Sequence, residues 1–211
     1  MGNLEAAARF DREIALRDGT RVRMRPIRPD DEPRLAALYD QLSRDTRYQR
    51  FFSVMRRLPP DWARFLANVD YERRFALVAE APDDPDTLIA VARYEPAGEP
   101  DTAEVAFVVQ DAWQGRGLGL VLFRELLSAA EGNGIRRFRA WVLAENRRML
   151  ELITPPGRNP ATVVRAGRGR AGVRGAAAQA VASAGKLSVK VVPRPGSDCT
   201  STWPPWSWMM P

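Results

Sequence analysis

The segment best suited to chemistry is glycine-rich and reads Gln114-Gly115-Arg116-Gly117-Leu118-Gly119-Leu120. Glycine allows positive φ angles and lets a ligand come within hydrogen-bonding distance of the backbone. Where such a segment opens a helix, its unbonded N–H groups and the helix dipole favour a bound anion such as a pyrophosphate. The spacing is neither the G-x-G-x-x-G of dinucleotide folds nor a P-loop ending in Gly-Lys-Ser/Thr. A tight strand-to-helix turn without a ligand is the alternative interpretation.

A second candidate is the carboxylate of Glu104, at the start of a predicted strand over residues 103–110. Strand alternation puts it on one face with Ala106 and Val108, whose side chains would form a partly apolar cleft. Burial of this kind disfavours the charged form and makes a carboxylate a better base. Such a base could take a proton from a substrate, directly or through water. The alternative is a solvent-facing glutamate at a strand end.

Two absences narrow the chemistry. The chain has no histidine and one cysteine, Cys199, so Ser-His and Cys-His dyads and an internal disulfide are excluded, and no metal site is expected. Carboxylates, backbone amides or a bound co-substrate must therefore carry any catalysis. The single cysteine fits a reducing compartment, and neither a long apolar run nor a secretory leader is indicated, so we expect a cytoplasmic protein without membrane contact.

Charge divides the chain into a body and a tail. Residues 154–211 hold eight Arg or Lys and one acid, Asp198, and carry a net charge of +7. Residues 1–153 therefore carry −1, and both lysines, Lys186 and Lys190, lie in the tail. The tail is rich in Ala, Gly, Arg and Pro, a composition that predicts disorder.

The elements that must position the glycine segment alternate between strand and helix patterns. One strand pattern is followed by two helices that begin near Asp30 and Pro60, and three strands then precede the glycine segment. A helix opens in that segment, and a further strand and helix follow it. The predicted strands cover residues 20–27, 75–81, 87–94, 103–110 and 137–143, and the last helix covers 147–153. This order indicates an α/β protein with a mixed sheet and helices packed on it.

The glycine segment after a strand, the following helix, the strand Arg137–Leu143 and the pair Glu145-Asn146 resemble the GCN5-related N-acetyltransferase (GNAT) family. The resemblance covers residues of about 18 to 153 and leaves residues 1–17 as a lead-in. Within the family, the segments 25–31, 47–52 and 68–71 are similar to bacterial protein lysine acetyltransferases. The GNAT domain of those proteins stands alone or is fused to an acyl-CoA synthetase-like region, and this chain shows no synthetase-like region.

The resemblance implies acetyl-CoA as the co-substrate. Its pyrophosphate would lie on the amides from Gly115 to Leu120, with Arg116 either adding charge to the phosphates or pointing into solvent. The amides near Val108 and Val109 would pair with the pantetheine arm and polarise the thioester carbonyl. Asn146 matches the family asparagine that contacts the cofactor, and it could also cap the last helix.

The resemblance also implies a catalytic role for Glu104, because many members have a glutamate base on this strand. The acceptor would be an amine, and the subgroup similarity favours a protein lysine over a small amine. A lysine ammonium has a pKa of about 10.4, so it must lose a proton before it can attack.

The family pattern ends at Thr154. Family members continue with two more strands, and the region after Asn146 often supplies a tyrosine that protonates the departing thiolate. This chain has no tyrosine after Tyr94. We therefore expect a GNAT-like fold that lacks its last two strands, and an inactive, truncated domain is an alternative to the enzyme.

Three interpretations of the tail remain open. Leu187–Val192 could form a short strand that pairs with the sheet edge. The tail as a whole could be an out-of-frame reading of a GC-rich gene, which translation of the other frames after codon 153 would test. The Arg/Gly-rich residues 165–175 could instead bind nucleic acid through its phosphates, in a protein whose body is catalytically inactive.

Overall fold

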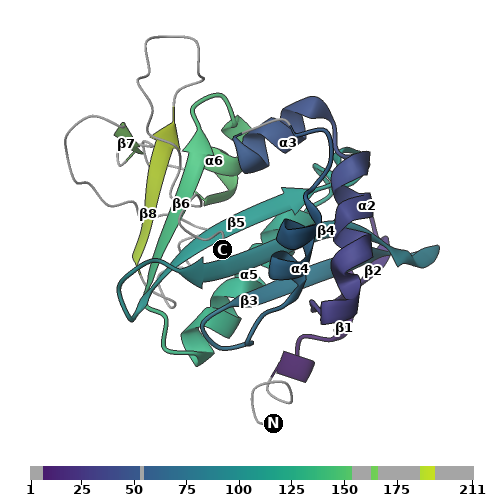
Figure 1. Ribbon diagram of the computed structural model, residues 1–211, viewed down its shortest axis with the longest axis horizontal. Helices are drawn as coiled ribbons and strands as arrows, with labels where there is room; N and C mark the ends of the chain where they lie inside the picture. Colours follow the sequence, from purple (N-terminus) through teal and green to yellow (C-terminus); the bar gives the residue numbers. More distant parts are fainter. Residues whose placement is uncertain (1–6, 53–54, 154–162, 166–185, 193–211) are drawn as a thin grey trace.

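The structure is a computed structural model that describes residues 7–52, 55–153, 163–165 and 186–192, with side chains placed up to residue 153. Its sheet has the strand order β1-β2-β3-β4-β5-β6-β8-β7 (Figure 1). The strands are β1 (Arg12–Ala15), β2 (Arg21–Pro26), β3 (Phe75–Ala81), β4 (Asp84–Pro96), β5 (Thr102–Val109), β6 (Arg137–Leu143), β7 (Val163–Arg165) and β8 (Lys186–Val192). The helices are α2 (Glu32–Gln41), α3 (Arg44–Phe51), α4 (Pro60–Ala67), α5 (Leu118–Gly132) and α6 (Arg147–Ile153).

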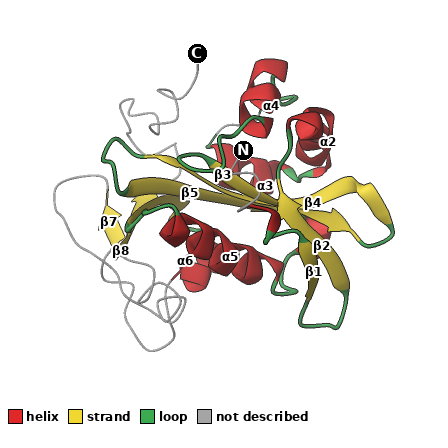
Figure 2. Cartoon of the chain, turned by 90° about the horizontal axis from the view of Figure 1, so that it is seen from below, coloured by secondary structure: helices red, strands yellow, loops and turns green. Residues whose placement is uncertain are grey.

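Helices cover both faces of the sheet, with α2 and α4 on one face and α5 and α6 on the other (Figure 2). Strand β3 shows the consequence, since it is buried on both sides. Ala76 and Val78 pack in the core that includes α2 and α4, whereas Leu77 and Ala79 pack with Phe123 of α5. A strand covered on both faces needs a nearly continuous apolar sequence, which explains why this segment does not alternate.

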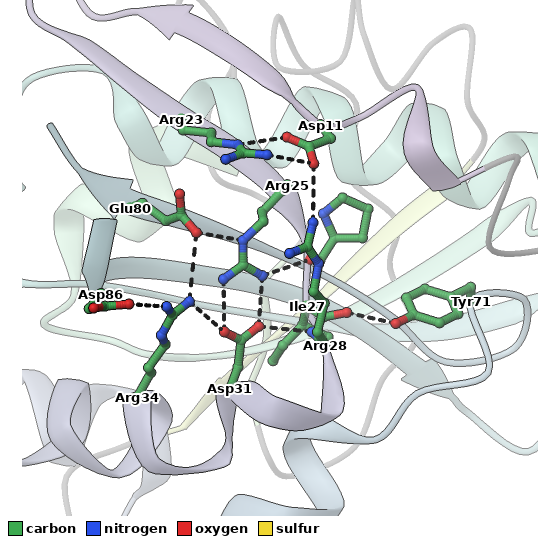
Figure 3. Close-up of polar contacts among 11 residues, drawn as sticks. Asp11, Arg23, Arg25, Ile27, Arg28, Asp31, Arg34, Tyr71, Glu80 and Asp86 are labelled. Atoms are coloured by element: carbon green, nitrogen blue, oxygen red, sulfur yellow. Dashed lines mark hydrogen bonds and ion pairs between the residues drawn. The ribbon is translucent and has the colours of Figure 1, made fainter. Parts of the chain in front are cut away.

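The junction between β2 and α2 is held by buried ion pairs (Figure 3). Arg25 is 1% exposed and donates to both carboxylate oxygens of Asp31, at 2.7 and 2.8 Å, and to Glu80 of β3 at 2.5 Å. Arg34 of α2 approaches the same two carboxylates and also pairs with Asp86. Burial lowers the pKa of Arg25, but the hydrogen bonds to Asp31 and Glu80 outweigh it and leave the pKa raised.

The two strands that frame the glycine segment diverge. β5 and β6 are parallel, and their pairing covers Thr102↔Arg137 to Glu104↔Arg139. Both strands continue beyond this point, β5 to Val109 and β6 to Leu143. The two arrows therefore separate towards their carboxyl ends, and α6 and α3 lie near the open side (Figure 1). This opening at the carboxyl ends of parallel strands is where ligands commonly bind in α/β sheets.

Several elements differ from the sequence-based expectation. The strand β1 and the helix α3 were not predicted, and β4 starts at Asp84, before the predicted strand at 87–94. Helix α3 has few apolar residues, so its periodicity is weak. Its N-terminus is capped by Ser43. Asp111, from a distant segment of the chain, accepts hydrogen bonds from the hydroxyls of Ser43 and Thr46 and so stabilises the start of the helix.

The tail contributes two strands to the sheet in the structure. The strand allowed at Leu187–Val192 is present as β8, parallel to β6, and β7 pairs with β8. Residues 154–162, 166–185 and 193–211 lie outside the described residues, and with them Cys199 and most of the Arg/Gly-rich segment. Within the described ranges, every helix is too short or too polar to cross a lipid bilayer.

Candidate active site

The gap between β5 and β6 opens into a cavity of about 580 Å³. Its wall combines one edge of β5, the glycine segment with the start of α5, and the helices α3 and α6. The lining residues are Arg17, Thr46, Gln49, Arg50, Glu104–Val109, Trp113, Gln114, Gly115, Gly117, Gly119, Leu120, Arg124, Trp141, Asn146, Arg148, Met149, Glu151 and Leu152.

The glycine segment presents its backbone N–H groups as the sequence predicted. Gly115 and Gly117 have φ angles of +81° and +92°, which a residue with a β-carbon rarely adopts. Gly117 caps α5, and the first amides bonded within the helix are those of Leu120 and Val121, which donate to the Gly117 carbonyl. Within the described part of the chain, the N–H groups of residues 115–119 donate no hydrogen bond. The start of α5 is therefore suited to an anion.

Gly119 allows α5 and α6 to approach each other. A β-carbon at this position would lie 3.3 Å from Cδ1 of Leu152 and 3.8 Å from Cγ2 of Val109. The glycine thus lets the first turn of α5 pack between the end of β5 and the helix α6. This close contact between Gly119 and Leu152 places α6 beside the start of α5, so that α6 forms part of the cavity wall.

Gln114 connects three walls of the cavity. Its side-chain amide donates to the carbonyl of Val109 at 3.0 Å and to the hydroxyl of Thr46 at 3.3 Å. Its side-chain oxygen accepts from Arg148 of α6 at 2.8 Å. The end of β5, helix α3 and helix α6 are therefore tied to the first residue of the glycine segment.

Glu104 lies at the narrow end of the gap, on the last residue pair that β5 forms with β6. It is 9% exposed and lines the cavity with Ala106 and Val108, but the intervening residues Val105 and Phe107 line the cavity as well. Its oxygen Oε2 accepts a hydrogen bond of 3.0 Å from the indole Nε1 of Trp141. Arg50 of α3 lines the same cavity. The surroundings are thus more polar than predicted, because α3 and β6 bring in side chains that strand alternation cannot reveal.

Arg50 is a buried cation in this wall. Burial and, to a smaller extent, the positive charge of Arg93 lower the pKa of Arg50 to about 9, although the carboxylates of Glu104 and Glu95 act in the opposite direction. A pKa of this size leaves the guanidinium charged at neutral pH. Glu104 therefore faces a permanent positive charge across the cavity.

Asn146 both caps a helix and lines the cavity. Its side-chain oxygen accepts from the N–H of Met149 at 3.1 Å, at the start of α6. The capping role that the sequence offered is therefore present, and the contact with a cofactor stays a prediction. The other residues expected at the cofactor that also line the cavity are Gln114, Gly115, Gly117, Gly119, Leu120, Val108 and Val109.

Two predicted site residues do not line the cavity. Arg116 is turned towards Asp18, with 3.4 Å between Nη1 and Oδ2, and lies over the ring of Trp113. Leu118 is 1% exposed and packs in the core beneath α5. The alternative given for Arg116, a side chain that points into solvent, is closer to this geometry, since 41% of its side chain is exposed.

The cavity has arginines that sequence reasoning did not find. Arg17 comes from the turn after β1, and its N–H donates to the Arg116 carbonyl at 3.1 Å, so this turn rests on the glycine segment. Arg124 lies on α5 and Arg148 on α6. Among the described residues, Arg17 and Arg124 form no ion pair with a carboxylate. No local motif marks them, because tertiary structure alone brings them to the loop.

Charge and shape together suit an elongated polyanion. Four arginines line the cavity, Arg17, Arg50, Arg124 and Arg148, against two carboxylates, Glu104 and Glu151. The unbonded amides lie at the mouth of α5, and Glu104 lies at the narrow end of the gap. A ligand with phosphates at one end and a reactive group at the other would match this arrangement.

The fold is that of a GNAT acetyltransferase. The sequence model described as the Acetyltransferase (GNAT) family matches residues 35–154, and the chain belongs to this family. The matched residues include β5, β6 and the glycine segment, which border the cavity.

Similar proteins carry acetyltransferase names. The chain is 33% identical over 139 residues to Acetyltransferase PA5475 of Pseudomonas aeruginosa, which covers 65% of this chain and 75% of that protein. It is 37% identical over 142 residues to Acetyltransferase Pat of Mycolicibacterium smegmatis, which covers 66% of this chain and 42% of Pat. The chain therefore spans less than half of Pat.

Solved structures of acyltransferases are also similar to this chain. The crystal structure of the GNAT domain of S. lividans PAT matches with a TM-score of 0.64 at 38% identity, over 69% of this chain and 86% of that domain. A mutant of a cAMP-binding acyltransferase from Mycobacterium smegmatis matches with a TM-score of 0.50 at 31% identity, over 72% of this chain and 44% of that one.

Proposed function

We propose that this chain transfers an acetyl group from acetyl-CoA to the amine of a protein lysine. The observation that carries the proposal is the cavity between β5 and β6, with unbonded amides at the start of α5 and the carboxylate of Glu104 at its narrow end. Family membership supports the donor and the reaction class.

The donor would bind along the length of the cavity. The amides of residues 115–119 would hold the pyrophosphate, whereas the Leu120 amide, also expected there, already donates to the Gly117 carbonyl, and Arg17 and Arg124 would add positive charge beside it. The pantetheine arm would follow the edge of β5 beyond Glu104, where Val108 and Val109 line the cavity. Backbone N–H groups there would polarise the thioester carbonyl and stabilise the developing negative charge.

Glu104 would act as the base. The acceptor ammonium gives a proton to the carboxylate, directly or through water, and the neutral amine attacks the thioester carbon. A C–N bond forms, the C–S bond breaks, and the CoA thiolate leaves with the electron pair. Every tyrosine in the chain lies at or before Tyr94, so a tyrosine acid after Asn146 is not available, and the thiolate would take its proton from water.

The lysine acceptor rests on the three segments that are similar to bacterial protein lysine acetyltransferases. One of them, residues 47–52, contributes Gln49 and Arg50 to the cavity wall. Another, residues 25–31, forms the buried ion pairs below α2 and supports that wall only indirectly. Of the three segments, only 47–52 contributes residues to the cavity wall, which makes α3 the part of the wall that supports a lysine acceptor.

Calorimetry and acetylation assays on the full chain test the proposal. We expect acetyl-CoA to bind and a lysine-containing peptide to be acetylated, while the same peptide with arginine in place of lysine is not. Spermine and free amino acids serve as small-amine competitors. A chain that binds no acetyl-CoA would contradict the donor assignment, and a chain that acetylates only small amines would contradict the acceptor assignment.

Glu104→Gln tests the base. We expect turnover at neutral pH to fall by about 10²–10⁴-fold, because general base catalysis typically contributes this much. The affinity for acetyl-CoA should stay unchanged, since the amide keeps the size of the side chain. Glu145→Gln is a matched control, because Glu145 is exposed and does not line the cavity. An unchanged rate in Glu104→Gln would remove Glu104 from the mechanism.

A further inference from the structure

Trp141 spans the gap between β5 and β6 just beyond the point where their pairing ends. Arg139 is the last residue of β6 that pairs with β5, and its partner is Glu104. Trp141 follows two residues later and therefore lies on the same side of the strand as Arg139. Its indole Nε1 donates to Oε2 of Glu104 at 3.0 Å. A side-chain hydrogen bond thus bridges the two strands where the backbone ladder no longer does.

The charged groups around Glu104 come from neighbouring elements. On β4, Glu95 is the residue opposite Glu104, and its carboxylate is paired with Arg93 and with Arg74. On α3, Arg50 lines the cavity and interacts electrostatically with Glu104.

Strand β6 and helix α6, across the gap from β5, also carry charged residues. On β6, Arg139 directs its guanidinium to Glu99 and to the carbonyl of Ala97, on the β4–β5 turn. Arg148 and Glu151 of α6 line the same cavity. The indole of Trp141 is the neutral donor in this group, and it does not titrate.

We propose that Trp141 is the positioning residue for Glu104: its indole N–H holds one carboxylate oxygen and so sets the orientation and basicity of the base. The inference rests on the proposed function, in which Glu104 takes the proton of the acceptor amine. A hydrogen bond to the charged form of a carboxylate favours that form. The indole is a donor only, so it stabilises the carboxylate without competing for the proton.

This role explains a feature of the cavity. Beyond Glu104, β5 stays paired with β4 but no longer with β6, so the side of Glu104 that faces β6 opens into the cavity. A base must lie within hydrogen-bond reach of the proton it takes. The bond from Trp141 constrains the carboxylate on this open side, while the ring of Trp141 forms part of the cavity wall.

Two variants remove the N–H group. Trp141→Phe removes the donor and keeps an aromatic ring, and replacement of Trp141 by β-(3-benzothienyl)alanine removes only the N–H, because sulfur takes its place. Trp62→Phe on α4 is the matched control, since Trp62 packs in the core on the α2 side of the sheet and does not line the cavity. Circular dichroism and thermal unfolding check that each variant folds.

The first measurement is the titration of the Glu104 carboxyl carbon by ¹³C NMR, assigned by comparison with Glu104→Gln. We expect its midpoint to move up by about one pH unit in both Trp141 variants and to stay unchanged in Trp62→Phe. The direction follows because the charged form loses a donor. An unchanged midpoint in the benzothienylalanine protein would overturn the inference, whether or not Trp141→Phe folds.

The second measurement is the pH dependence of kcat/KM for acetyl transfer. We expect its acid limb to move to higher pH in the same direction as the titration, with the KM for acetyl-CoA unchanged. Lower activity with an unmoved acid limb and titration midpoint would show a structural role only and would contradict the inference. If the wild-type chain transfers no acetyl group, the proposed function fails, and the titration still decides whether Trp141 controls Glu104.

Discussion

Arginine has opposite roles in two regions of this protein. At the junction of β2 and α2, the guanidinium of Arg25 is buried and bound by the carboxylates of Asp31 and Glu80 (Figure 3). In the cavity, Arg17 and Arg124 are exposed and form no ion pair with a described carboxylate. The first region compensates every charge within the protein, and the second leaves positive charge available for a ligand. Charge compensation, not residue type, separates a structural arginine from a binding one.

The largest effect is expected in the compensated region. Asp31→Asn removes the carboxylate that binds Arg25 in two places and leaves a buried charge without its main partner. Breaking a buried pair in this way costs about 3–5 kcal/mol of unfolding free energy. Denaturant unfolding measures the loss, and Asp30→Asn is the control because Asp30 is exposed. A loss below about 1 kcal/mol, as for surface ion pairs, would contradict the structural role.

The same pair predicts a pH dependence of stability. Burial raises the pKa of Asp31, but the hydrogen bonds from Arg25 and from the N–H of Arg28 outweigh it and leave the pKa lowered. A lowered folded-state pKa contributes stability above the unfolded value of about 3.9 and loses it as the pH falls through the folded value. The stability difference between wild type and Asp31→Asn should therefore shrink below about pH 4, and a constant difference would argue against the pair.

A medium effect is expected at the start of α5. Gly117→Ala places a β-carbon on a residue with φ of +92° and within 3.0 Å of Cγ of Arg17. Such strain costs about 1–3 kcal/mol and should also displace the loop that would hold the pyrophosphate. Gly98→Ala is the matched control, since Gly98 has φ of +84° with open space around it. Calorimetry should show weaker acetyl-CoA binding for Gly117→Ala only. Equal affinity in the two variants would contradict the assignment of this loop to pyrophosphate binding.

The smallest effect is expected for a single uncompensated arginine. Arg17→Gln should weaken acetyl-CoA binding about tenfold, or ~1.4 kcal/mol, while stability changes little. Binding of S-acetylpantetheine, which lacks the phosphates, should not change. Arg21→Gln controls for the loss of an exposed arginine in the same hairpin, because Arg21 pairs with Glu13 instead. If Arg17→Gln weakens the binding of acetyl-CoA and of S-acetylpantetheine equally, Arg17 does not contact the phosphates.

The part of the site that depends on local sequence could be predicted. The glycine segment at 114–119 follows a strand and opens a helix because its glycines permit the required φ angles, and the structure agrees. Asn146 could be placed at the start of α6 for the same reason, since a cap acts within one turn. Glu104 could be placed by alternation along β5.

The rest of the site depends on contacts between distant segments. Arg17 reaches the loop because the turn after β1 rests on the Arg116 carbonyl, a contact across about half of the chain that leaves no local pattern. Trp141 reads in the sequence as one apolar residue of a strand, and only the divergence of β5 and β6 turns its indole towards Glu104. Helix α3 was missed because Asp111, far along the chain, helps to cap it.

By itself, the sequence determined the α/β class, the family and the backbone chemistry of the glycine loop, because each depends on periodicity or on the φ angles of single residues. Only the tertiary structure decided which side chains face the ligand. It turned Arg116 away, buried Leu118, and brought Arg17, Arg50 and Trp141 to the cavity. The physical reason is that the direction of a side chain is set by its packing partners, and those partners lie on elements that the sequence does not place in space.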